Sequence, residues 1–142
     1  MLDAGALKAM PEESAAGRPL RVLFVDDEPS LVQLARYALE RAGWEVVVAC
    51  TGEQAAAVFA AEHASIDVIV LDLVLPDCRG RTLLDRLAAI DDTVPVVIAS
   101  GMEAEQVAAM LGERPDHFIH KPYSLTSLPA SLRAIVSHTA AV

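Results

Sequence analysis

Lysine is scarce in this chain. Nine arginines accompany only two lysines, and one of these, Lys8, falls in an N-terminal stretch rich in alanine, glutamate, glycine and proline. Lys121 is therefore the only lysine of the predicted folded body. A lysine ammonium is a compact, mobile point charge, whereas the arginine guanidinium is a planar fork. A single lysine in a chain that otherwise uses arginine suggests a place where such a charge is needed.

Several other features are missing, and each absence excludes a class of protein. No cluster of basic residues exceeds a pair of neighbours and the net charge is −9, which disfavours direct binding to a nucleic-acid backbone. No Gly-x-x-x-x-Gly-Lys segment occurs, so a nucleotide-binding phosphate loop is not expected. No apolar run approaches the roughly 20 residues of a membrane span. The N-terminus has neither the basic start nor the apolar centre of a secretory signal.

Cysteine is nearly absent. Cys50 and Cys78 have no metal-binding spacing and form no disulfide framework. A reducing, cytoplasmic location is therefore expected. Cys50 ends an apolar run and is expected to be packed inside. Cys78 is expected to be exposed in the loop near Asp72, and no redox role is expected for it.

Apolar runs and amphipathic stretches alternate five times between residues 20 and 138, which we interpret as one domain between a flexible N-terminal extension (1–19) and a short tail (139–142). The expected strands are 21–25, 44–49, 67–71, 95–99 and 117–120. The expected helices are 29–42, 51–62, 81–90, 103–111 and 125–137. The apolar stripe of the first helix is expected to consist of Leu31, Leu34, Ala35, Ala38, Leu39 and Ala42. The second helix should open on a capping box of Thr51 and Gln54. Pro129 would interrupt the last helix, which should begin near Thr126 or kink.

Nearly continuous apolar strands separated by helices predict a doubly wound α/β fold, with a parallel sheet covered by helices on both faces. In such sheets ligands bind at the carboxyl ends of the strands. Five polar side chains from four strands fall at this edge: Asp26, Asp27, Asp72, Ser100 and Lys121. Three carboxylates together repel one another, so a cation is expected among them, and oxygen ligands favour Mg²⁺.

These residues permit phosphoryl transfer. The Asp72 carboxylate is the candidate nucleophile, since a carboxylate can attack phosphorus and form an acyl phosphate. Mg²⁺ would neutralise the developing charge, while Lys121 and Ser100 would each hold one further phosphoryl oxygen. Both side chains would then sense the new group.

Four segments carry a resemblance to a known family: Val25-Asp26-Asp27-Glu28, the stretch from Leu71 to Gly80, Ala99-Ser100-Gly101 and Lys121-Pro122-Tyr123. Together, in this order, they resemble the receiver domain of two-component response regulators over residues 20–138. The resemblance implies a flavodoxin-like (CheY-like) sheet of five strands in the order 2-1-3-4-5.

The resemblance also implies roles for single residues. Asp72 would be the phosphoacceptor, Asp27 the main metal ligand, Asp26 its neighbour acting through water, and the backbone carbonyl of Val74 the further metal ligand. Ser100 and Phe118 would form the conformational switch, Lys121 would contact the phosphoryl group, and the Lys121–Pro122 peptide would be cis. Val74 and Met102 would border the attacking water, where their apolar side chains suggest a longer-lived phosphoryl group.

The expected partners follow from this reading. The phosphoryl donor would be a phosphohistidine on a sensor histidine kinase or a phosphotransfer protein. Because little chain follows the predicted body, output is expected through a downstream protein partner, on a face that includes Val107, Met110, Phe118 and Leu128. Neither nucleic acid nor membrane is expected as a partner. The protein would be a monomer or a phosphorylation-dependent dimer, and a signalling domain rather than an enzyme.

Other interpretations of the same residues stay open. The chain could be a receiver fragment of a hybrid histidine kinase, a phosphorelay intermediate, or a receiver-like scaffold that is never phosphorylated. A Mg²⁺-dependent phosphohydrolase with an aspartyl nucleophile is a further alternative, although Val74 stands where many such enzymes have an acid. His117 and His120 are expected to be strand-face residues rather than metal ligands.

Overall fold

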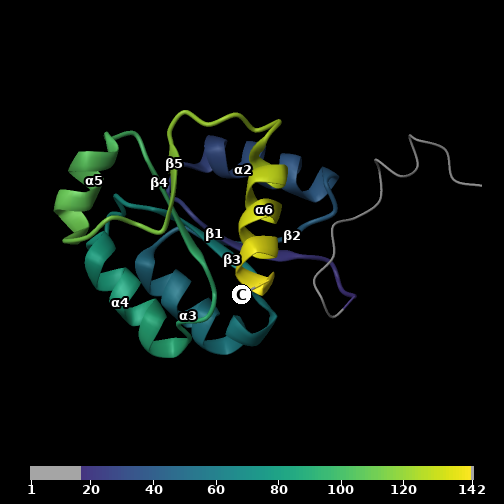
Figure 1. The fold of residues 1–142 in the computed structure, drawn as a ribbon, viewed down its shortest axis with the longest axis horizontal. Coiled ribbons are helices and arrows are strands. Elements are labelled where there is room, and N and C mark those ends of the chain that lie inside the picture. Colours follow the sequence, from purple (N-terminus) through teal and green to yellow (C-terminus); the bar gives the residue numbers. More distant parts are fainter. Residues whose placement is uncertain (1–16, 142) are drawn as a thin grey trace, which may run out of the picture.

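The centre of the molecule is a parallel sheet of five strands (Figure 1). The computed structural model describes residues 17–141. The strands are β1 (Arg21–Val25), β2 (Glu45–Ala49), β3 (Val68–Asp72), β4 (Val96–Ser100) and β5 (His117–His120). They are arranged in the order β2-β1-β3-β4-β5, and every neighbouring pair is parallel. The predicted fold class and strand order are confirmed.

Helices cover both faces of this sheet (Figure 1). In the described part of the chain they are α2 (Pro29–Arg41), α3 (Gly52–Glu62), α4 (Gly80–Ile90), α5 (Ala104–Leu111) and α6 (Leu128–Ala141), with a 3₁₀ turn at His63–Ser65. Helices α2 and α6 pack on one face, and α3, α4 and α5 pack on the other. None of the described helices is both long and apolar enough to span a membrane.

The alternation of side chains along each strand explains why the strands are apolar throughout. In β1, Leu23 and Val25 enter the core under α3, α4 and α5, while Val22 and Phe24 enter the core under α2 and α6. All four are at most 1% exposed. Each such side chain stabilises the fold by about 1.5–3 kcal/mol on burial, so neither face of the strand tolerates a polar residue.

Local signals set the helix boundaries. The Thr51 hydroxyl accepts the N–H of Gln54 at 3.1 Å and caps α3. The Gln54 side chain accepts the N–H of Cys50 at 2.8 Å instead of that of Thr51, so only half of the predicted capping box forms. Glu103 and Gln106 form a complete capping box at the start of α5. Gly112 ends that helix with a φ of 80°, a left-handed conformation that favours glycine.

Three sequence-based details were wrong. Helix α6 begins at Leu128, so that Pro129 lies in its first turn, where the missing N–H costs nothing. Leu34, predicted on the inner stripe of α2, is 56% exposed, and Val32 is buried in its place. Cys50 is exposed rather than packed.

The N-terminal side of the domain is fixed by an ion pair. Arg18 contacts the Asp67 carboxylate through both terminal nitrogens, at 3.0 and 3.2 Å, and the N–H of Arg21 donates to the same carboxylate at 2.8 Å. Most of the predicted extension, residues 1–16, lies outside the described residues, as does Val142.

Candidate phosphoacceptor and metal site

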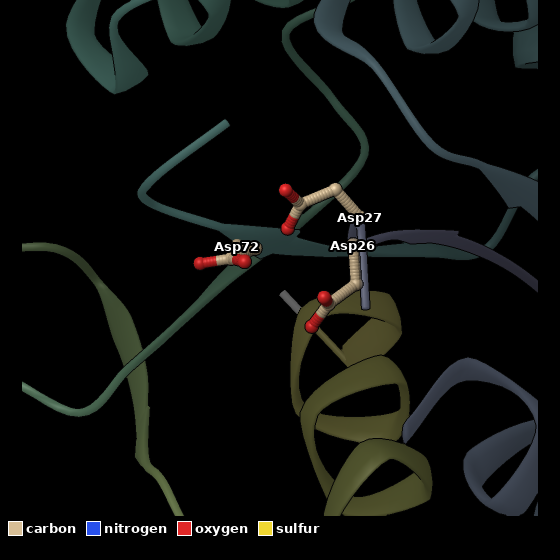
Figure 2. A group of neighbouring side chains, drawn as sticks. All are labelled: Asp26, Asp27 and Asp72. Atoms are coloured by element: carbon tan, nitrogen blue, oxygen red, sulfur yellow. The ribbon is translucent and has the colours of Figure 1, made fainter. Parts of the chain in front are cut away.

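Three carboxylates meet at the carboxyl ends of β1 and β3. Asp26 and Asp27 follow β1, and Asp72 is the last residue of β3. Figure 2 shows the Asp26 and Asp27 side chains leaving the end of β1 in different directions, with Asp72 beside them on the neighbouring strand. One oxygen from each carboxylate lies within 4.8 Å of the other two. Asp26 is 2% exposed and Asp72 is 9% exposed, whereas Asp27 faces solvent.

Backbone hydrogen bonds hold two of these carboxylates in place. The N–H of Asp26 donates to the carbonyl of Ala49 at 3.1 Å, which extends the β1–β2 ladder by one residue. Its Oδ1 then accepts the N–H of Glu28 at 2.9 Å, which turns the chain toward α2. Asp72 Oδ1 accepts the N–H of Val74 at 3.1 Å. Both carboxylates are therefore oriented before any ligand binds.

Lys121 joins the two buried carboxylates. Its Nζ lies 2.8 Å from Asp26 Oδ2 and 3.4 Å from Asp72 Oδ2. The backbone N–H of Lys121 donates to the carbonyl of Ser100 at 2.8 Å, which places the residue directly after β5. The Lys121–Pro122 peptide is cis, as predicted. The only lysine of the predicted body thus lies among the predicted acids.

The charges of this site oppose one another. Burial raises the pKa of Asp72 and the Asp26 charge raises it further, while the Val74 N–H and Lys121 act against both. Burial alone would lower the pKa of Lys121, but the Asp26 and Asp72 carboxylates outweigh it and raise that pKa. Lys121 therefore stays protonated. With all groups ionised, three carboxylates against one ammonium leave a formal charge of −2.

The donor set suits a hard divalent cation. Its ligand atoms are all oxygens and they carry an excess of negative charge, which is what Mg²⁺ and Ca²⁺ prefer. In the part of the chain that the structure describes, this is the one group of acidic, histidine or cysteine side chains that could hold a metal. His117 and His120 lie in β5 and are not part of this group.

Ser100 and Phe118 lie on the β4–β5 side of the site. Ser100 ends β4, is 3% exposed, and its hydroxyl accepts the N–H of Met102 at 3.0 Å. In the β4–β5 ladder Ser100 pairs with His120 and Ile98 pairs with Phe118. The Phe118 ring is partly buried, with the ring of His120 edge-on to it at 6.2 Å between centroids.

Comparison with known proteins identifies the family. The family model described as response regulator receiver domain matches residues 22–133. The chain belongs to this family. The transcriptional regulatory protein TrcR of Mycobacterium tuberculosis is 39% identical to this chain over 124 residues, which are 86% of this chain and 47% of TrcR. The chain spans about half the length of the curated relatives it matches.

Solved structures agree with the receiver fold. The CheX–CheY–BeF₃–Mg²⁺ complex from Borrelia burgdorferi contains a chain that is 25% identical, with a TM-score of 0.75; the match covers 84% of this chain and 91% of that one. A CheY-like receiver domain protein from Methanospirillum hungatei has a TM-score of 0.77 at 23% identity, covers 86% of this chain and 97% of its own, and shows the fold alone.

The structure corrects the composition of the predicted partner-contact face of the receiver. Val107 is fully buried and Leu128 is 2% exposed, so neither can touch a partner. Both belong to the cores beneath α5 and α6. Met110 is 52% exposed and Phe118 is partly exposed, and these two remain available.

Asp77 is a structural residue of the site loop that sequence reasoning missed. Its Oδ1 accepts the N–H of Gly52 at 2.8 Å and its Oδ2 accepts the N–H of Glu53 at 3.0 Å. These bonds lower the pKa of Asp77 and tie the loop after Asp72 to the first turn of α3. A Cβ on Gly52 would collide with Sγ of Cys78, so the loop and the helix touch directly. Nothing in the sequence links residues 52 and 77.

Cys78 is half-buried in this loop. Burial raises the pKa of its thiol and the neighbouring Asp77 charge raises it further, so the unreactive thiol form is favoured. The Arg86 charge opposes both effects but does not outweigh them. The site loop therefore gives no support to a redox role for Cys78.

Proposed function

We propose that Asp72 accepts a phosphoryl group from a phosphohistidine of a sensor histidine kinase or a histidine phosphotransfer protein, in a reaction that depends on Mg²⁺. The observation that supports this most is the meeting of Asp26, Asp27 and Asp72 within 4.8 Å, with Lys121 between two of them. The Borrelia chain of similar fold was solved in a complex named as containing BeF₃ and Mg²⁺, which agrees with such a site.

The transfer needs little from the protein beyond position and charge. An Asp72 oxygen attacks phosphorus, the bond from phosphorus to the histidine nitrogen breaks with its electron pair going to the imidazole, and a mixed anhydride forms on Asp72. Lys121 Nζ, already 3.4 Å from Asp72 Oδ2, donates to one phosphoryl oxygen, and the Ser100 hydroxyl donates to another. Mg²⁺ would be held by Asp26, Asp27, Asp72 and the carbonyl of Val74, and it would neutralise charge on the phosphoryl group.

The new group then changes the surface of the domain. A phosphoryl group adds nearly two negative charges next to the buried Ser100. The Ser100 hydroxyl would then give up the hydrogen bond that it accepts from the Met102 N–H and donate to a phosphoryl oxygen. Because Ser100 lies in the β4–β5 ladder, its movement reaches Phe118, two residues before its partner His120. We propose that this switch acts on a downstream protein through the exposed side of α5, β5 and α6, where Met110 lies.

The other features of the proposal rest on sequence and family. The relatives, of which this chain matches about half, include proteins named as transcriptional regulators. We propose no direct nucleic-acid contact by this domain, because its net charge is −9. A cytoplasmic location, and a monomer or phosphorylation-dependent dimer, stay predictions. The phosphohydrolase alternative gains no support, because exposed Val74 supplies no acid two residues after Asp72.

Intact mass after incubation with acetyl phosphate tests the proposal. With Mg²⁺ the chain should gain the mass of one phosphoryl group, and with EDTA in place of Mg²⁺ it should gain none. Asp72→Asn should abolish the gain. The matched control Asp92→Asn, an exposed carboxylate after α4, should keep it.

The alternatives predict other results. A folded protein that never gains the phosphoryl mass would support the scaffold interpretation and overturn the proposal. Repeated turnover of a phosphate monoester would support the hydrolase instead.

A further inference from the structure

The hydroxyl of Tyr123 is a polar group that the interior leaves without a partner. Among the described residues, the buried side-chain atoms with no hydrogen-bond partner are Trp44 Nε1 and the Tyr123 hydroxyl oxygen. Trp44 precedes β2, at the end of the sheet opposite the carboxylates. Tyr123 follows Lys121 by two residues and packs on the same face of the sheet as Phe24, which stands two residues before Asp26. Buried polar groups nearly always have a partner, so this hydroxyl needs an explanation.

Packing alone does not explain a tyrosine at this position. Tyr123 is partly buried and packs against the core that contains Phe24 and Leu128. A phenylalanine would keep the contacts of the ring with this core. It would also avoid leaving a buried oxygen unpaired, which is unfavourable. In this conformation the unpaired hydroxyl is therefore unfavourable for stability, and its presence points to another state of the protein that uses it.

The surroundings of the hydroxyl contain acceptors. Burial raises the pKa of Tyr123, and the negative charges of Asp26, Asp72 and Glu28 raise it further. The hydroxyl therefore keeps its proton and remains a hydrogen-bond donor in the field of these carboxylates. A carboxylate oxygen is the acceptor that such a hydroxyl could donate to.

Among these carboxylates, Asp26 is the one whose present hydrogen-bond donor, Lys121, can move to a phosphoryl group on Asp72. Its Oδ1 accepts the N–H of Glu28 at 2.9 Å, and its Oδ2 accepts Lys121 Nζ at 2.8 Å. Lys121 is already 3.4 Å from Asp72 Oδ2. A phosphoryl group on Asp72 carries nearly two negative charges and attracts the lysine more strongly than a carboxylate does. When Lys121 turns to it, Asp26 Oδ2 loses its only hydrogen bond from a side chain, and the carboxylate keeps the Glu28 N–H and its share in holding the metal.

We propose that Tyr123 is a positioning residue of the phosphorylated state, in which its hydroxyl replaces Lys121 as the hydrogen-bond donor to the Asp26 carboxylate. This change of donor keeps the Asp26 carboxylate oriented while the Lys121 ammonium donates to the phosphoryl group. The inference rests on the proposed function of Asp72 and adds a residue to it. No bond beyond this hydrogen bond is formed or broken by Tyr123.

The test compares Tyr123→Phe with the wild type, using Mg²⁺ and beryllofluoride as the probe of the phosphorylated state. Tyr37→Phe is the matched control, because Tyr37 is 62% exposed on α2 and bonds only with Arg41 on its own helix. Thermal unfolding in EDTA measures the metal-free fold, and calorimetry at saturating Mg²⁺ measures beryllofluoride affinity. Tyr123→Phe should unfold in EDTA at the same temperature as the wild type or higher. It should bind beryllofluoride about tenfold more weakly, equivalent to about 1.4 kcal/mol, while the control binds as the wild type does.

A merely structural tyrosine would give a different pattern. Tyr123→Phe that lowers the unfolding temperature in EDTA, with unchanged beryllofluoride affinity, overturns the inference and leaves the proposed function intact. A wild type that binds no beryllofluoride with Mg²⁺ overturns the proposed function and the inference with it.

Absorption gives a second readout. The chain has two tyrosines, so in the Tyr37→Phe variant Tyr123 is the only one. Addition of Mg²⁺ and beryllofluoride should then shift the tyrosine absorption band, because the hydroxyl gains an acceptor. A bound complex with an unshifted band overturns the inference.

Discussion

Removal of Lys121 should destabilise the metal-free protein much more than the loss of an ordinary surface charge. The lysine side chain is 20% exposed and that of its closer partner, Asp26, is 3% exposed, so the pair is largely screened from water. Loss of one partner from a buried ion pair costs about 3–5 kcal/mol. Asp26 keeps its bond from the Glu28 N–H and Lys121 is partly solvated, which reduces the expected cost of Lys121→Met to about 2–3 kcal/mol.

Urea unfolding in EDTA measures this cost as a shift of the midpoint, and at about 1–3 kcal/mol per molar the shift should be about 1 M or more. Mg²⁺ should restore the lost stability, because the variant site carries one more uncompensated negative charge. At a concentration of about 100 times its dissociation constant the ion contributes about 2.7 kcal/mol. Arg36→Ala, which breaks an exposed pair with Glu40, is the control and should stay within about 0.5 kcal/mol. Equal, small shifts in both variants, or no recovery with Mg²⁺, would refute the reasoning.

Two further predictions concern the loops around the sheet. The Thr93 side chain and N–H hold the pKa of Asp91 at about 2, below an unfolded value of about 3.9, so the ionised form adds stability above about pH 4 that is lost as pH falls through about 2. Asp91→Asn should therefore cost less than about 1 kcal/mol at neutral pH, and urea midpoints of the variant and wild type should converge near pH 2. Gly52→Ala should lower the free energy of unfolding by about 1–3 kcal/mol, because its Cβ would collide with Cys78. Adding Cys78→Ala should recover most of the loss in urea unfolding, and no recovery would mean that the strain lies elsewhere.

The sequence predicted the elements well where side-chain chemistry and backbone pairing coincide. The strands 21–25 and 117–120 were predicted to the residue. Asp72 and Ser100 were expected just after their strands, but both belong to the ladder, since Asp72 pairs with Ala99 and Ser100 with His120. A polar side chain at a strand end does not prevent its backbone from pairing. The change from apolar to polar residues therefore predicted the ends of β3 and β4 one residue too early.

Other features depend on packing that a pattern of apolar residues does not specify. In α2 the apolar spacing allows either Leu34 or Val32 to face the core. The packing of α2 against α6 and the sheet buries Val32. Val107 and Leu128 were assigned to a partner surface from their positions in the chain, yet the same positions face the two cores. The Asp77 bonds to the start of α3 join residues 24 and 25 positions apart, and no local spacing encodes them.

The ammonium that joins two of the site acids comes from 95 residues further along the chain than Asp26. Early strands can gather the acidic residues, but their mutual repulsion is relieved only after the last strand has docked at the edge of the sheet. Competence for phosphate chemistry thus belongs to the finished domain alone, and a nascent or clipped chain that lacks this strand should be inert toward a donor even if its first strands are already paired.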